Sequence, residues 1–112
     1  MVDLSFLRNF SKGKQAKFER YIRLYLSLAE ESYEAMESGF AESDWSKVAN
    51  FAHSLSPQAT YMGITGLKEV LAEIEQEAKG DKNQAILASN IKKARLLHEA
   101  AVPHLEAALS WI

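Results

Sequence analysis

Residues 45–63, WSKVANFAHSLSPQATYMG, carry apolar side chains that return every three or four positions. This spacing places them on one face of a helix, because an α-helix turns by about 100° per residue. Ser43 and Asp44 are both good caps for the start of this helix, and Gly63 follows its last apolar residue. The stretch therefore predicts an amphipathic helix with one buried face, made of Trp45, Val48, Ala52, Leu55, Ala59 and Met62.

Three other segments show the same helical spacing, at about 11–39, 65–80 and 81–111, and a short helix is expected at about 3–10. The 112 residues include only 5 Gly and 2 Pro. The sequence has no alternating run of β-branched residues, so no strand is predicted. Short connections force neighbouring helices to run antiparallel. The sequence thus predicts an all-α fold, an up-down-up-down four-helix bundle with a short extra N-terminal helix, formed by residues 1–112 as a single domain.

The ends of the helices follow from capping residues. Thr65 is the expected cap of the helix at 65–80, and Asp81 with Gln84 is expected to form a capping box for the last helix. Gly39 and Gly80 are expected to end the helices that precede them, because glycine is common just after a helix.

The composition excludes several classes of protein. The formal charge of −2 argues against a general nucleic-acid binder, and the lack of cysteine excludes disulfides and thiolate ligands. No apolar run approaches the roughly 20 residues that span a membrane, and the N-terminus lacks the layout of a signal peptide. A cytoplasmic protein or excised domain that binds neither nucleic acid nor membrane is expected.

Charge is nevertheless uneven along the chain. Residues 1–23 contain six basic and two acidic side chains, and residues 24–44 contain six acidic and no basic ones. Solvated helix faces account for such runs most simply, and a basic end that meets an acidic partner is the functional alternative.

Motifs for metal-dependent, nucleotide-dependent or hydrolytic chemistry are absent: the sequence has no phosphate-binding loop, dinucleotide turn, HExxH or GxSxG. His98 and His104 lie six residues apart, which does not align two imidazoles on one helix face. His98 is interpreted as a core or boundary histidine and His104 as a boundary histidine. The sequence predicts neither a metal site nor a cofactor.

His53 lies about 130° from the centre of the apolar stripe, on the exposed side of its helix. An isolated surface histidine usually has no role, but the neighbours of this one are all compact and uncharged. Such a surface would let another protein approach the imidazole closely. The neighbours are Ser46, Ala49, Asn50, Ser56, Pro57 and Thr60.

Several residues around His53 resemble the signature of histidine-containing phosphotransfer (HPt) domains. In that family a helix bears roughly A-H-x-L-K-G, a glycine follows ten residues after the histidine, and the next helix ends its apolar pattern in Leu-Glu. The resemblance extends over most of the chain and implies a four-helix bundle. The matching residues are Ala52, His53, Leu55, Gly63, Leu67 and Glu75.

The resemblance implies that His53 accepts a phosphoryl group from a receiver-domain aspartate of a two-component phosphorelay and passes it on. A neutral imidazole nitrogen is nucleophilic near pH 7, and the receiver supplies the acidic pocket and its Mg²⁺. The chain would then be a phosphoryl carrier rather than a self-contained enzyme, a monomer that needs no cofactor. Its implied partners are response-regulator receiver domains and a hybrid sensor histidine kinase, docked on the six compact neighbours of His53.

Two positions depart from the family pattern. Ser56 stands where the family usually has lysine, and Pro57 where it has glycine. The lysine would hold phosphoryl oxygens electrostatically, and a serine hydroxyl offers only a neutral hydrogen bond. The alternative function is therefore a degenerate HPt-like adaptor that binds a receiver or kinase without transferring phosphate. An unrelated helical interaction module is a third interpretation.

Overall fold

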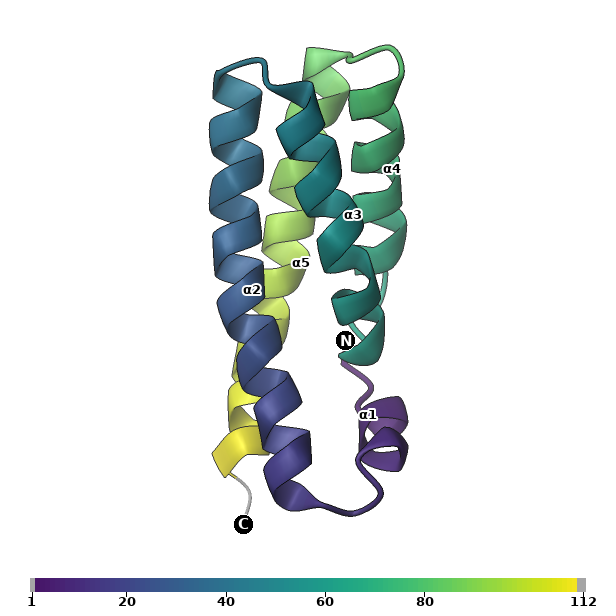
Figure 1. Cartoon of the computed structure of the whole chain (residues 1–112), viewed down its shortest axis with the longest axis vertical. Coiled ribbons are helices and arrows are strands. Elements are labelled where there is room, and N and C mark those ends of the chain that lie inside the picture. The colour runs from purple at the N-terminus through teal and green to yellow at the C-terminus, as the bar shows by residue number, and fades with distance from the viewer. Residues whose placement is uncertain (1, 111–112) are drawn as a thin grey trace.

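The computed structural model describes residues 2–110. Within this range the chain forms α1 (Ser5–Phe10), α2 (Gln15–Ala41), α3 (Trp45–Tyr61), α4 (Leu67–Lys79) and α5 (Gln84–Ser110). Figure 1 shows the four longer helices side by side and alternating in direction, with α1 beside the lower end of α3. These observations confirm the all-α class and the bundle with a short N-terminal helix. The expected end of the last helix at Trp111 lies outside the described residues.

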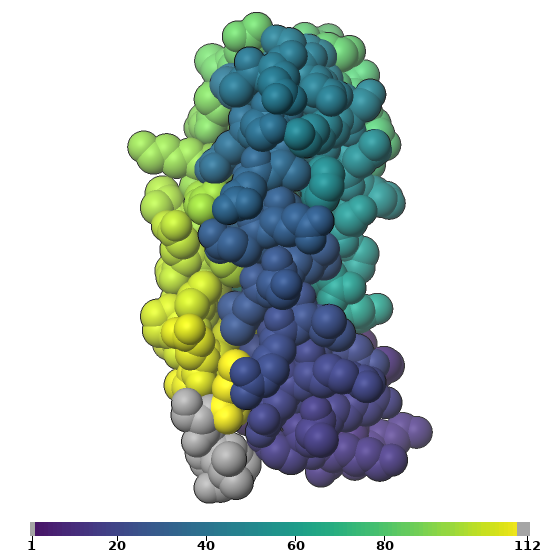
Figure 2. Space-filling model, turned by 60° about the vertical axis from the view of Figure 1, so that its left-hand side comes forward, coloured from purple at the N-terminus to yellow at the C-terminus, as the bar shows by residue number. Residues whose placement is uncertain are grey.

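The four long helices form a closed ring. Helix α2 packs against α3 and α5, and α4 packs against the same two helices. Figure 2 shows α2 along the middle of one face, with α3 on one side and α5 on the other. The molecule is a rod of 45 × 20 × 19 Å, and no helix among residues 2–110 is long and apolar enough to cross a bilayer.

The core follows the predicted apolar stripes. On α3, Val48, Ala52, Leu55 and Ala59 are all buried, whereas Trp45 is half-buried against Phe40. The two alanines on this face leave room for neighbouring helices to approach closely. The buried face of α3 therefore packs on the core from Val48 to Ala59. This packing fixes the direction in which the side chains on its outer face point.

The helix caps agree with the sequence at one end and differ at two others. The carboxylate of Asp44 accepts a hydrogen bond from the Lys47 amide at 3.1 Å, as predicted. Thr65 does not cap α4, because Gly66 stands before the helix with a φ of 85°. The expected capping box is also wrong, since the Ile86 amide donates to the side chain of Asn83 at 3.1 Å. Asn83 is the residue directly before α5, so its oxygen is nearer the first free amides.

Gly39 does not end α2, which continues to Ala41. A Cβ at this position would lie 3.1 Å from Cγ2 of Val48 and 3.2 Å from the Asp44 carbonyl oxygen. Those contacts are tighter than ordinary van der Waals separations. Gly39 thus marks a close approach between the end of α2 and the start of α3, rather than a helix stop.

Gly63 fixes the N-terminal segment to the end of α3. Its φ is 62°, in the left-handed region, and a Cβ there would overlap the backbone of Asp3. The Asp3 amide donates to the Gly63 carbonyl at 2.9 Å, and Val2 forms an isolated bridge with Ile64. Glycine is therefore needed at position 63, ten residues after His53, because the Asp3 backbone leaves no room for a side chain there.

His98 is the buried histidine of the core. It is 4% exposed, its Nδ1 lies 2.9 Å from the Tyr25 hydroxyl, and its ring packs at 5.3 Å from that of Tyr33. Burial lowers the pKa of His98, and the nearby Glu30 and Glu99 carboxylates only partly oppose this effect. The folded state therefore favours the neutral imidazole.

Stability is expected to fall in mild acid because of His98. A folded pKa below the unfolded value near 6.5 means that unfolding takes up a proton. The free energy of unfolding should be flat above about pH 7 and decrease as the pH falls through about 6.5. Urea unfolding between about pH 5.5 and 7.5 measures this slope. His98→Gln should remove it and His104→Gln, at an exposed position, should keep it; an unchanged slope in His98→Gln contradicts the assignment.

Candidate functional site

His53 lies in the middle of α3, and 72% of its side chain is exposed. Ala52 and Leu55, on the opposite side of the same turns, are completely buried. Helix α3 continues through Pro57 to Tyr61, so the imidazole is carried by regular helix on both sides. The core therefore anchors the backbone of His53 while its ring stands in solvent.

A carboxylate from the neighbouring helix orients the imidazole. Nδ1 of His53 lies 3.0 Å from Oε1 of Glu75 on α4, and 19% of the Glu75 side chain is exposed. The hydrogen bond from Lys79 lowers the pKa of Glu75, and the His53 ring lowers it further. An ionised carboxylate can only accept, so Nδ1 carries the proton of this hydrogen bond. In the neutral ring, Nε2 then holds the free electron pair.

Five of the six compact neighbours of His53 line the same outer side of α3. Ser46, Asn50, Pro57 and Thr60 are exposed, and Ser56 is half-buried. The Thr60 hydroxyl donates to the Ser56 carbonyl at 3.1 Å, so it turns back onto the helix. The α3 side chains beside the imidazole are consequently small and uncharged, and the charged neighbours of the ring belong to α4.

Ala49 is a correction to the predicted surface. It is 2% exposed and belongs to the core, so it cannot offer contact area to a partner. Lys47, on the other flank of α3, donates to Ser38 of α2 at 2.9 Å. By helical geometry the flank with Ala49 and Ser56 turns toward α4. The buried arc is wider than the apolar stripe suggests, because α3 packs against two helices.

An exposed aromatic cluster adjoins the end of α3. Tyr61, the last residue of that helix, stacks on Phe6 at 5.4 Å and on Phe10 at 6.3 Å. Lys17 lies over the ring of Phe10 at 5.0 Å, which is a cation–π distance. We call Phe6, Phe10 and Tyr61 the aromatic cluster. Lys17, one of the basic residues of the N-terminal region, thus interacts with an aromatic ring of the protein itself.

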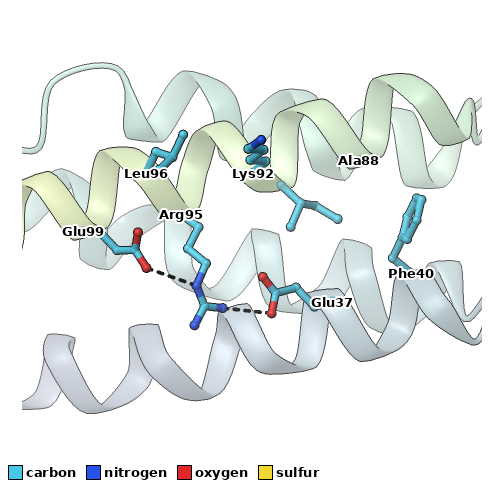
Figure 3. A pocket seen from close by; sticks show the side chains of 8 residues that line it. Glu37, Phe40, Ala88, Lys92, Arg95, Leu96 and Glu99 are labelled. Atoms are coloured by element: carbon cyan, nitrogen blue, oxygen red, sulfur yellow. Dashed lines mark hydrogen bonds and ion pairs between the residues drawn. The ribbon is translucent and has the colours of Figure 1, made fainter.

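A groove of about 250 Å³ lies between α2 and α5. Figure 3 shows Arg95 in this groove, with dashed lines to Glu37 and Glu99. Its guanidinium lies 2.9 Å from the Glu37 carboxylate and 3.5 Å from that of Glu99, which makes two ion pairs. Glu30 lies a further 3.5 Å from the same guanidinium. Arg95 and these three carboxylates are thus paired within the protein. The α2–α5 side of the ring is opposite to the α3–α4 side that carries His53. In the part of the chain that is described, no three His, Cys, Asp or Glu side chains gather to hold a metal.

Sequence reasoning missed two parts of the site. Lys79, whose ammonium lies 2.7 Å from Oε2 of Glu75, was not identified, although its spacing of four residues from Glu75 is the usual one for a helical ion pair. The aromatic cluster had no local signal, because Phe6 and Tyr61 are distant in the sequence. Glu75 was noted as a matching residue, but its contact with His53 needed the fold.

Comparison with known proteins agrees with this geometry. No curated protein and no solved structure matches the chain. A family model described as Hpt domain matches residues 20–110, which include α3, α4 and the residues His53, Glu75 and Lys79. The chain therefore belongs to the Hpt domain family.

Proposed function

We propose that this protein carries a phosphoryl group on His53, taking it from the aspartate of a receiver domain and passing it to another. Membership of the Hpt family supports a histidine phosphotransfer role in a phosphorelay. The observation that carries the assignment to this residue is the hydrogen bond from His53 to Glu75 at 3.0 Å. In the neutral ring this bond leaves Nε2 unprotonated, on a side chain that is 72% exposed and can reach a partner.

The chemistry needs little from this chain beyond that nitrogen. Nε2 attacks the phosphorus of the receiver's aspartyl phosphate, the N–P bond forms, and the P–O bond to the aspartate breaks with its electron pair kept by the carboxylate. The proton stays on Nδ1, so the ring becomes positively charged. The Glu75 carboxylate stabilises that charge. In the reverse direction the same steps return the phosphoryl group to an aspartate.

The partner surface is proposed to surround the imidazole. Ser46, Asn50, Pro57 and Thr60 give a face without charged side chains, against which a receiver domain can bring its phosphorylated aspartate close to Nε2. The aromatic cluster gives one end of that face an apolar contact, and aromatic side chains are enriched at protein interfaces. A hybrid sensor histidine kinase that bears such a receiver is a partner of the same kind.

Ser56 motivates the second candidate, an adaptor that binds a receiver without transfer. The side chain is half-buried on the flank of α3 that turns toward α4. It carries no positive charge for the phosphoryl oxygens, whereas Glu75 beside the ring is negative. Under the adaptor hypothesis receiver binding survives His53→Ala, and no phosphohistidine forms.

Incubation with a phosphorylated receiver domain tests the proposal, and Ser56 provides the comparison. Wild-type protein is expected to acquire an acid-labile, alkali-stable phosphate. Ser56→Lys should raise the yield of label about fivefold, since one added charge-assisted contact is worth roughly 1 kcal/mol at a partly exposed site. Ser89→Lys adds the same charge at an exposed position of α5, outside the proposed docking surface, and should change the label little. No label in the wild type or in Ser56→Lys, with binding retained, favours the adaptor.

A further inference from the structure

The helix that bears His53 offers no cation to a phosphoryl group on that residue. Lys47 is the only lysine or arginine in α3. Its ammonium donates to Ser38 at 2.9 Å and lies 3.8 Å from the Glu42 carboxylate, so it is held on the flank of α3 that faces α2. A positive charge that binds phosphoryl oxygens beside His53 must therefore come from another helix.

Helix α4 places a lysine next to the partner of His53. The two oxygens of the Glu75 carboxylate bind different groups: Oε1 lies 3.0 Å from Nδ1 of His53, and Oε2 lies 2.7 Å from Nζ of Lys79. The Lys79 side chain is 62% exposed, so solvent and a docked group can reach it. An ammonium has three N–H donors and the contact with Oε2 uses one of them. Lys79 can therefore bind a further oxygen without leaving Glu75.

The direction of the two helices brings Lys79 to the side toward which the imidazole leans. Helices α3 and α4 pack together and run in opposite directions (Figure 1). Lys79 comes one turn after Glu75, so it lies beside the turn of α3 that precedes His53. Side chains of a helix lean toward its N-terminus, and the imidazole leans over that same turn. The exposed α3 side chain there is Asn50, which carries no charge.

We propose that Lys79 donates to the phosphoryl group carried on His53 and so supplies, from α4, the cation that the family usually has at the position of Ser56. Nε2 attacks phosphorus as described above, and the ammonium keeps its protons throughout. Its N–H groups bind phosphoryl oxygens, and its charge offsets the repulsion between those oxygens and the Glu75 carboxylate. The inference rests on the proposed function for the phosphorylation of His53.

A purely structural role for Lys79 is the competing explanation. Glu75 and Lys79 are four residues apart in one helix, and Lys79 is in the last turn of α4, where a cation interacts favourably with the helix dipole. Loss of such a pair weakens α4 slightly, and it leaves the acceptance of a phosphoryl group by His53 unchanged. The two roles therefore differ in what they do to phosphorylation.

Phosphoramidate, a small phosphoryl donor that needs no receiver, separates them. Nε2 attacks its phosphorus, the N–P bond to the ring forms, and the donor's own P–N bond breaks with its electron pair leaving on ammonia. Lys79→Met should slow the initial labelling of His53 about fivefold, the size of one charge-assisted hydrogen bond at an exposed site. Lys79→Arg keeps the charge and should keep most of the rate.

Lys68→Met is the matched control. Lys68 is another exposed lysine of α4, on nearly the same side of the helix as Lys79 and about 16 Å from it along the axis. That separation exceeds the range of an exposed charge at physiological ionic strength. The labelling rate of Lys68→Met should equal that of the wild type.

Two further measurements show whether Lys79 contacts the phosphoryl group or acts only by holding Glu75. In a Glu75→Gln background, Lys79→Met should still slow labelling at least about twofold, because the partner of the ammonium is the phosphoryl group. In wild-type protein, the NMR signal of the Lys79 ε-carbon should move when His53 is phosphorylated, and that of Lys68 should not. A role confined to the stability of α4 moves neither signal.

Equal labelling rates in wild type and Lys79→Met overturn the inference. Loss of the Lys79 effect in the Glu75→Gln background overturns it as well, and so does a Lys79 signal that phosphorylation leaves in place. A His53 that phosphoramidate does not label contradicts both the inference and the proposed function. Labelling of His53 by phosphoramidate that depends on Lys79, in a chain that no phosphorylated receiver labels, supports the inference and counts against the proposed function.

Discussion

Replacing His53 by glutamine is expected to reduce phosphoryl labelling by a phosphorylated receiver to background, a loss of at least about a hundredfold. The amide of glutamine has no nucleophilic nitrogen, so no N–P bond can form. It can still donate a hydrogen bond to Oε1 of Glu75, which keeps the link between α3 and α4 that the imidazole makes at 3.0 Å. Autoradiography after incubation with the labelled receiver measures the effect.

His104→Gln is the matched control for this experiment. His104 is an exposed histidine on α5, so it is accessible to a labelled receiver but lies on another helix. It should retain wild-type labelling. Urea unfolding should give both variants the same free energy of unfolding within about 0.5 kcal/mol, as expected of substitutions at exposed positions. Label that persists in His53→Gln would show that another residue carries the phosphate.

Gly63→Ala is expected to destabilise the fold by about 3 kcal/mol or more. The left-handed φ of 62° costs an alanine roughly 1–2 kcal/mol. The added Cβ would overlap the Asp3 backbone, so the N-terminal segment must move and lose the hydrogen bond from the Asp3 amide, worth about 1 kcal/mol. Leu7, which is buried at the other end of this segment, would lose packing as well. Urea unfolding followed by far-UV circular dichroism gives the difference.

Gly13→Ala separates the two causes. Gly13 also has a positive φ, of 76°, but a Cβ there would meet nothing within 4 Å. It should cost only the conformational part, about 1–2 kcal/mol. Equal losses of unfolding free energy in the two variants would mean that the contact with Asp3 contributes nothing. Gly63 would then be needed only for its left-handed φ.

The apolar stripes made the bundle predictable from the sequence. Each stripe needs only local spacing to be recognised, and a buried side for Val48, Ala52 and Leu55 follows from it directly. The direction of His53 followed for the same reason, since it is the opposite side of one helix. Glycine positions were less informative, because Gly39 serves a contact between α2 and α3 that only the packed bundle reveals.

What the sequence could not show depends on distances between helices. Ala49 looks exposed when α3 is considered alone, and it is buried in the bundle, where α3 packs against two helices. The same packing brings Glu75 to His53 and, through it, Lys79 to the site. The register of α3 against α4 decides which residues meet, and no local pattern in either helix contains that register.

The exposed position of His53 on a single helix face limits how the protein can be used. The imidazole is exposed on one side of α3 and backed by a buried core, so a receiver docked over it would leave no room for a second one. Under the proposed function, donor and acceptor receivers must exclude each other and take turns. Occupancy by an abundant unphosphorylated receiver would then slow delivery to every other one, so relative partner concentrations would govern how the signal is divided.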